Sequence, residues 1–184
     1  MFALIVGGSG SGKSEYAENL AVSWGAKEHL PLYYVATMEP WGEEGRRRIL
    51  RHQKLREGKG FETIECYRNL EELKLPSRGV VLLECLSNLA ANEMFAEDGA
   101  GEKTLPAVVQ GVRALRDRCC HLAAVTNDIF CDGAAYDETT EQYRRCLGEI
   151  NAELSKEADQ VTEVVCGILL HQKEAVNEPV VEQL

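Results

Sequence analysis

The chain has 184 residues, and its 30 acidic and 20 basic side chains give a formal net charge of −10. This length suits one α/β domain with a real core and is short for two. The acidic balance argues against nonspecific nucleic-acid binding but allows a locally positive nucleotide site, and no apolar run approaches the roughly 20 residues of a membrane span.

The seven cysteines are irregularly spaced, and no C-x-x-C pair occurs among them. We therefore expect free thiols in a reducing cytoplasm. A strand that begins at Phe2 is also expected to leave no space for a secretory signal before it. The sequence Cys119-Cys120-His121 lacks a second pair at zinc spacing, which disfavours a metal site there.

The beginning of the chain carries the clearest motif. An apolar run at 2–6 predicts a strand, and helical periodicity from about residue 12 to 24 predicts a helix. Between them lies G-x-x-x-x-G-K-S, the phosphate-binding P-loop, whose backbone N–H groups cradle phosphates while its lysine reaches the β- and γ-phosphates and its serine faces Mg²⁺. The predicted nucleotide-binding residues of this loop are Gly7, Gly8, Ser9, Gly10, Ser11, Gly12, Lys13 and Ser14.

The rest of the chain alternates between strand and helix patterns. Strands are predicted at 32–36, 61–66, 80–84, 122–126 and 160–168, and helices at 43–56, 86–96, 104–119 and 139–158. Such alternation indicates a mostly parallel sheet with helices on both faces. With the P-loop, it predicts an α/β fold of the P-loop NTPase (RecA-like) class, three layers thick. We expect one nucleotide-binding domain at 1–173 and an acidic C-terminal tail at 174–184, either frayed or packed as a last segment.

Ligands of open parallel sheets lie beyond the carboxyl ends of the strands, so the residues that follow each strand are informative. Thr37 follows the second strand and is predicted to contact the nucleotide. In the helix after it, Glu44, Arg48, His52 and Arg56 are spaced by four and would share one face. A solvated charged face is the ordinary interpretation of such a stripe.

A histidine among arginines allows a second interpretation of this helix. Nearby positive charge disfavours protonation of the imidazole, and a neutral imidazole is a nucleophile. Arg48 and Arg56 would then bind phosphates. We therefore predict His52 as a catalytic residue and the two arginines as nucleotide ligands.

Two further strands end in polar residues. Glu84 directly follows a buried apolar run, where P-loop enzymes hold Mg²⁺ or its water shell, and pairing with an arginine is the structural alternative. Asn127 and Asp128 either cap a helix or line the site. The predicted catalytic residues are thus His52, Lys13 and Glu84, Glu84 is also a predicted nucleotide ligand, and the predicted metal ligands are Ser14 and Glu84.

In this order and spacing, the residues resemble the bifunctional adenosylcobinamide kinase / adenosylcobinamide-phosphate guanylyltransferase family of cobalamin biosynthesis. The resemblance covers about residues 2–170. Beyond the P-loop, it rests on the segments 34–37, 82–85, 125–127 and 164–168, together with Glu44, Arg48, Ile49, His52, Arg56, Tyr143, Arg144, Gly148 and Asn151.

The resemblance implies two reactions. In the first, ATP or GTP phosphorylates the aminopropanol hydroxyl of adenosylcobinamide. In the second, the family's histidine in the Arg-x-x-x-His segment, here His52, attacks the α-phosphate of GTP, and the guanylylated enzyme passes GMP to adenosylcobinamide-phosphate. Mg²⁺ is expected with both nucleotides, and the family's ring-like assemblies imply a homotrimer.

The segment after Asn127 departs from the family pattern. The family usually has glutamate and a glycine-rich turn there, whereas this chain has Asp128 and continues with Phe130 and Tyr136. Two alternatives therefore remain open. One is a P-loop kinase for a different small acceptor, in which His52 only contacts phosphate, and the other is a nucleotide-binding paralogue with reduced catalysis.

Overall fold

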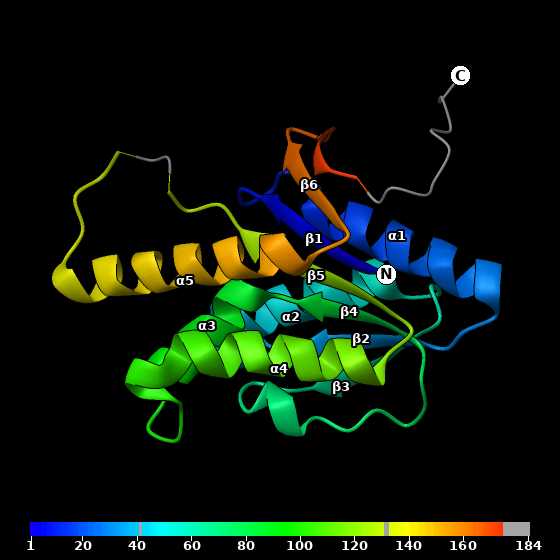
Figure 1. The fold of residues 1–184 in the computed structure, drawn as a ribbon, viewed down its shortest axis with the longest axis horizontal. Helices are drawn as coiled ribbons and strands as arrows, with labels where there is room; N and C mark the ends of the chain where they lie inside the picture. Colours follow the sequence, from blue (N-terminus) through cyan, green and yellow to red (C-terminus); the bar gives the residue numbers. More distant parts are fainter. Residues whose placement is uncertain (41, 131–132, 175–184) are drawn as a thin grey trace.

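A mostly parallel sheet forms the middle layer of the molecule (Figure 1). In the computed structural model, which describes residues 1–40, 42–130 and 133–174 apart from the side chains of Glu44, Arg48 and Leu55, the sheet has seven strands in the order β3-β2-β4-β5-β1-β6-β7. Neighbouring strands are parallel, except for the antiparallel pair β6 and β7. The strands are β1 (Phe2–Gly7), β2 (Leu32–Ala36), β3 (Phe61–Glu65), β4 (Val80–Glu84), β5 (His121–Asn127), β6 (Gln160–Val165) and β7 (Ile168–Lys173).

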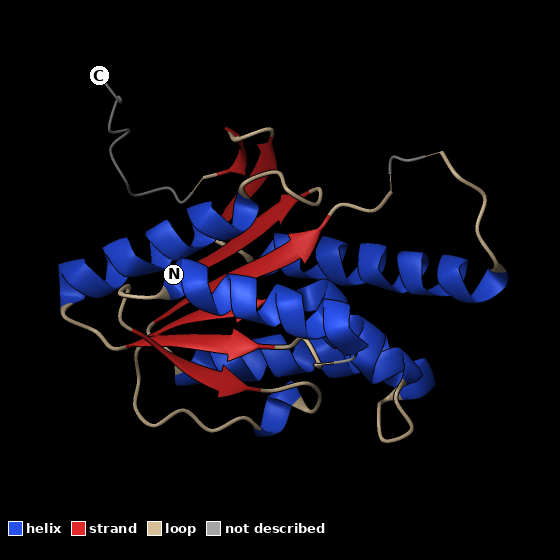
Figure 2. Cartoon of the chain, turned by 180° about the vertical axis from the view of Figure 1, so that it is seen from behind, coloured by secondary structure: helices blue, strands red, loops and turns tan. Residues whose placement is uncertain are grey.

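Helices cover both faces of this sheet, as predicted. The helices are α1 (Lys13–Glu28), α2 (Gly42–Arg56), α3 (Leu86–Phe95), α4 (Thr104–Arg118) and α5 (Glu138–Glu157), with short 3-10 turns η1 (Leu70–Glu72) and η2 (Gly101–Lys103). Helices α3, α4 and α5 lie on one face of the sheet, and α1 and α2 lie on the other face (Figures 1 and 2). Within the described part of the chain, no helix is long and apolar enough to cross a membrane.

The strands are apolar nearly throughout because both of their faces are buried. Successive side chains of a strand point to opposite faces. On β2, Tyr33 packs into the core shared with α3, α4 and α5, whereas Tyr34 packs into the core shared with α1. Both tyrosines are almost fully buried, so this strand carries two equivalent aromatic residues in two different environments.

The register of the sheet brings the carboxyl ends of neighbouring strands to one edge. Gly7 of β1 pairs with Asn127 of β5, and Ala36 of β2 pairs with Glu84 of β4 on one side and with Glu65 of β3 on the other. The P-loop and the residues that follow β4 and β5 therefore face the same space, which is where ligands of such sheets bind.

The single strand predicted at 160–168 is wrong, because the chain reverses after Val165. Cys166 and Gly167 both have positive φ, 50° and 82°, as a type I′ hairpin turn requires. The apolar residues on both sides of the turn hid it from the periodicity. The Gly167 N–H donates to the Ser11 carbonyl at 2.8 Å, so the hairpin tip contacts the P-loop. Of the predicted tail, residues 175–184 lie outside the described part of the chain.

Two helical glycines provide a matched test of this packing. A Cβ at Gly111 of α4 would lie 2.8 Å from Leu70 Cβ, whereas one at Gly148 of α5 would lie 3.5 Å from Phe130 Cε1. We expect Gly111→Ala to lower the free energy of unfolding by about 1–3 kcal/mol through overpacking against η1. We expect Gly148→Ala to raise it by up to about 1 kcal/mol through helix propensity. Urea unfolding measures both, and equal changes would contradict the close approach of α4 and η1.

Candidate active site

A cavity of about 1040 Å³ opens at the carboxyl edge of the sheet. Its volume lies at the upper end of the range for small-molecule sites. The P-loop, β2, α2, β4 and the segment after β5 all contribute to its wall. The predicted residues that line it are Ser9, Gly10, Ser11, Gly12, Lys13, Ser14, His52, Arg56, Glu84, Asn127 and Asp128.

The P-loop is shaped by its glycines and closed by its lysine. Gly12 has φ of 97°, which other residues rarely adopt, and a Cβ at Gly7 would lie 2.6 Å from both Ser11 Oγ and the Val164 carbonyl oxygen. Lys13 Nζ donates to the Gly8 carbonyl at 2.9 Å. Burial lowers the pKa of Lys13, and Cys85 and Glu84 partly oppose this effect. Gly7 and Gly8 were predicted to bind the nucleotide but do not line the cavity, whereas Ser9 to Ser14 do.

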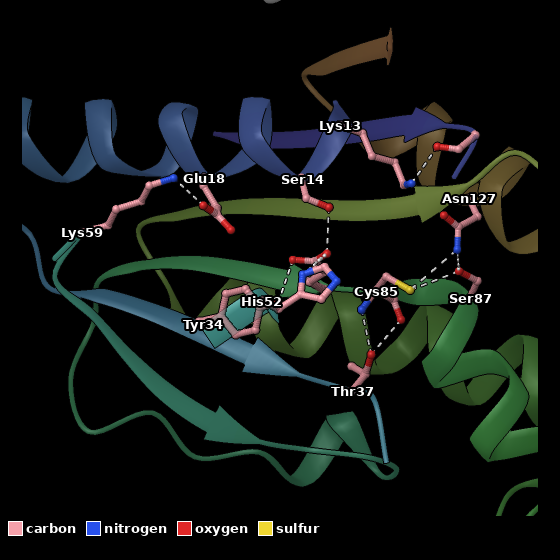
Figure 3. A network of polar contacts seen from close by, with 12 residues as sticks. Lys13, Ser14, Glu18, Tyr34, Thr37, His52, Lys59, Cys85, Ser87 and Asn127 are labelled. Carbon is pink, nitrogen blue, oxygen red and sulfur yellow. Dashed lines mark hydrogen bonds and ion pairs between the residues drawn. The ribbon is translucent and has the colours of Figure 1, made fainter. Parts of the chain in front are cut away.

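Glu84 joins three polar side chains in the wall of the cavity. Its Oε1 accepts a hydrogen bond from Ser14 Oγ at 2.8 Å, and its Oε2 accepts one from the Tyr34 hydroxyl at 2.7 Å. His52 Nδ1 lies 3.4 Å from Oε1. Figure 3 shows the Ser14, Tyr34 and His52 side chains converging on this point. Among the described side chains the partners of Glu84 are therefore serine, tyrosine and histidine, and the alternative of pairing with an arginine has no support.

The His52 side chain faces the cavity and is 29% exposed. Its Nδ1 is buried and makes no hydrogen bond within the described part of the chain. Among the described side chains, the charged group that it contacts is the Glu84 carboxylate. The predicted cluster of arginines includes Arg48, whose side chain is outside the described part. A carboxylate beside Nδ1 can hold the ring with its proton on that nitrogen, which leaves Nε2 with a free electron pair.

Arg56 lies one turn after His52 on α2 and is only 7% exposed. Its guanidinium carbon lies 3.3 Å from the centroid of the Tyr34 ring, a cation–π contact. Its Nη1 is buried without a hydrogen-bond partner among the described residues, so it can donate to a phosphate oxygen in the cavity. Arg48 lies on α2, but its side chain is outside the described part.

Thr37 is fully buried and does not line the cavity. Its hydroxyl donates to the Cys85 carbonyl at 2.9 Å and accepts from the Cys85 N–H at 2.7 Å. These bonds hold the backbone directly after Glu84. A contact with the nucleotide was predicted, but the structure gives Thr37 a supporting position instead, because its hydroxyl is bonded to the Cys85 backbone at the end of the neighbouring strand β4.

Asn127 and Asp128 line the cavity rather than cap a helix. The next helix, α5, begins at Glu138, and its cap is Asp137, whose carboxylate accepts from the Thr140 N–H at 2.9 Å. Asn127 Nδ2 donates to Ser87 Oγ at 2.6 Å, so its amide is held at the floor of the site. Of the two predicted roles, capping a helix and lining the site, the structure supports the second.

The positions of Ser14 and Glu84 fit Mg²⁺. Their side-chain oxygens are 2.8 Å apart, and oxygen ligands are the ones that Mg²⁺ prefers. No cluster of three or more His, Cys, Asp or Glu side chains that could hold a metal occurs among the described residues. An ion here would therefore take one or two ligands from the chain and the rest from phosphates and water, which is the usual arrangement for Mg²⁺ at nucleotides.

Sequence reasoning missed the role of Tyr34. The residue was notable only as part of a segment that resembles a family, and nothing in its local pattern indicates a partner. Its hydroxyl reaches Glu84 because β2 and β4 are neighbours in the sheet, and the strand order cannot be read from the spacing of the strands along the chain.

Comparisons with known proteins found a family and two relatives that match nearly the whole chain. The profile of the family described as cobinamide kinase / cobinamide phosphate guanyltransferase matches residues 3–172. Two relatives are named bifunctional adenosylcobalamin biosynthesis protein CobU, one from Salmonella typhimurium (strain LT2) at 31% identity and one from Escherichia coli (strain K12) at 29%. Each alignment covers 91% of this chain and 97% of the relative.

A comparison with solved structures bears on the fold alone. The ATPase domain of G40P superposes with a TM-score of 0.56 at 10% identity, covering 96% of this chain and 78% of that chain. This likeness and the sheet topology confirm the predicted RecA-like fold of P-loop NTPases.

Proposed function

Because the chain belongs to the cobinamide kinase / cobinamide phosphate guanyltransferase family, we propose that it phosphorylates adenosylcobinamide and then transfers GMP from GTP to the product through a guanylylated His52. The observation that carries this proposal is the chain of contacts from the P-loop to the imidazole. Ser14 of the loop bonds Glu84, and His52 Nδ1 lies 3.4 Å from the same carboxylate oxygen. A nucleophile, a phosphate cradle and a carboxylate thus share one cavity.

In the guanylyl transfer, Nε2 of His52 attacks the α-phosphorus of GTP. The N–P bond forms as the bond from the α-phosphorus to the bridging oxygen breaks, and pyrophosphate leaves with the electron pair. The Glu84 carboxylate, whose Oε1 lies 3.4 Å from Nδ1, stabilises the positive charge of the imidazole during attack. In the second half, a phosphate oxygen of adenosylcobinamide-phosphate attacks the same phosphorus, the N–P bond breaks, and the imidazole is regenerated with the GDP-linked product.

In the kinase reaction, the chain mainly positions and neutralises charge. The P-loop N–H groups and Lys13 would hold the β- and γ-phosphates, and the free Nη1 of Arg56 would supply a further donor. Mg²⁺, held by Ser14 and by Glu84 directly or through water, would neutralise the charge that develops on the phosphates. We take ATP and GTP as the candidate phosphoryl donors.

The proposal also covers the domain, the assembly and the location of the protein. We propose that residues 1–173 act as one nucleotide-binding domain. The family resemblance supports a homotrimer, and we place it in the cytoplasm.

Labelling with GTP tests the proposed function. With Mg²⁺ present, α-labelled GTP should leave a label on the protein that survives a denaturing gel and is acid-labile and base-stable, whereas γ-labelled GTP should leave none. Adenosylcobinamide-phosphate should remove the label as the GDP-linked corrinoid.

The unusual segment after Asn127 favours one second candidate, a P-loop kinase for a different acceptor. No protein label, with γ-phosphoryl transfer intact, would support that kinase. Tight GTP binding with neither label nor turnover would instead indicate a nucleotide-binding paralogue with reduced catalysis.

A further inference from the structure

The two oxygens of the Glu84 carboxylate contact different side chains. Oε1 faces both Ser14, at 2.8 Å, and His52, at 3.4 Å, whereas Oε2 has one hydrogen bond within the described residues, from the Tyr34 hydroxyl at 2.7 Å. The final torsion of a glutamate is soft, so packing alone holds a carboxylate plane poorly. The Tyr34 bond therefore holds Oε2 while the Ser14 bond holds Oε1, and the two together can set this plane.

Tyr34 is itself held rigidly. The residue is 4% exposed and packs in the core against α1. Arg56 covers one face of its ring, with the guanidinium carbon 3.3 Å from the ring centroid, and Arg56 lies on α2 one turn after His52. The tyrosine thus contacts the carboxylate through its hydroxyl and the helix of the nucleophile through its ring.

The hydroxyl of Tyr34 donates to Glu84 Oε2 at 2.7 Å. A protonated phenol can donate to an ionised carboxylate, and such charge-assisted bonds are short and strong.

We propose that Tyr34 is a positioning residue for the guanylyl transfer, whose hydroxyl fixes the Glu84 carboxylate so that Oε1 stays directed at Ser14 and at His52 Nδ1. This inference rests on the proposed function of His52. Tyr34 acts only through Glu84 and exchanges no proton or bond with the nucleotide. Without its hydroxyl the carboxylate can rotate, its negative charge moves away from Nδ1 for part of the time, and fewer molecules present Nε2 for attack.

The neighbouring tyrosine is a matched control. Tyr33 lies on the same strand, is 2% exposed, and its hydroxyl forms a hydrogen bond with Ser77 Oγ at 2.8 Å. Its side chain packs on the opposite face of the sheet, among α3, α4 and α5 residues. Tyr33→Phe therefore removes a comparable buried hydroxyl without touching Glu84.

The experiment is single-turnover labelling with α-labelled GTP, measured over a range of GTP concentrations. Tyr34→Phe should slow the labelling rate at saturating GTP by about ten- to a hundredfold, the loss expected for a hydrogen bond to a charged group. The GTP concentration for half-maximal rate should change by less than about twofold. Tyr33→Phe should leave both quantities within about twofold of wild type.

A double variant tests whether Tyr34 acts through Glu84. A Glu84→Gln background should itself label slowly, and Tyr34→Phe should produce little further loss in it, because interacting residues are not additive. A full second loss would overturn the inference, as would equal effects of the two phenylalanine variants or an effect confined to GTP affinity. If wild type takes no label, or His52→Ala keeps it, the proposed function fails and this inference fails with it. If wild type takes the label, His52→Ala abolishes it, and Tyr34→Phe labels as fast as wild type, this inference fails while the proposed function stands.

Discussion

His52→Ala is expected to lower the covalent label from α-labelled GTP to less than about one thousandth of the wild-type amount. Alanine has no electron pair to attack the α-phosphorus, and water that attacks in its place leaves nothing on the protein. Transfer of the γ-phosphoryl group should persist within about tenfold, because the kinase reaction does not form a bond to His52. The two readouts, from α- and γ-labelled GTP, therefore separate in this one variant.

His171→Ala is a suitable control. His171 is an exposed residue of β7, and its Nδ1 lies 3.1 Å from Thr162 Oγ1. It does not line the cavity. Intact-mass measurement should find one GMP adduct on the His171 variant and none on the His52 variant. An adduct of normal amount on the His52 variant would place the nucleophile elsewhere and remove the basis of the guanylyltransferase proposal.

Much of the fold could be predicted because most signals in this chain are local. The bounds of β2 and β4 match the prediction, since each is a short apolar run that both faces of the sheet bury. The P-loop predicts the position of the site because Gly12, Lys13 and Ser14 are consecutive in the sequence. The β6–β7 hairpin was missed because cysteine rarely adopts a φ of 50° and because apolar residues continue through the turn.

The contacts of the site could not be predicted in the same way. Helical spacing predicted arginines beside His52, but it gave no sign of the Glu84 carboxylate, which the orientation of α2 against the sheet brings to His52. The contact of Tyr34 with Glu84 depends on β2 lying beside β4. Both contacts join segments that are distant in sequence, and only strand order and helix placement bring them together.

Lys13→Ala is the second variant with a large expected effect. Removal of the ammonium should weaken GTP binding by about ten- to a hundredfold and lower the rates of both reactions by about 10²- to 10³-fold, as loss of a donor to developing negative charge does elsewhere. GMP lacks the β- and γ-phosphates that Lys13 would contact, so its affinity should change by less than about threefold. Titration calorimetry with the two nucleotides measures this difference.

Lys27→Ala is the matched control, because Lys27 lies at the exposed far end of the same helix, α1. It should leave both affinities unchanged. Unchanged GTP affinity in the Lys13 variant would show that the loop is not the phosphate cradle, and equal losses for GTP and GMP would place Lys13 away from the β- and γ-phosphates.

The stability of the Lys13 variant gives an independent check on the same argument. Burial lowers the pKa of Lys13, which means that the fold disfavours its charged form when no phosphate is present. Lys13→Ala should therefore not lower the melting temperature of the nucleotide-free protein. Saturating GTP should raise the melting temperature of the wild type more than that of the variant at the same concentration, since a ligand stabilises in proportion to the logarithm of its concentration over Kd. A variant that melts early without nucleotide, yet gains as much from GTP as the wild type, would assign Lys13 to folding and not to phosphate binding.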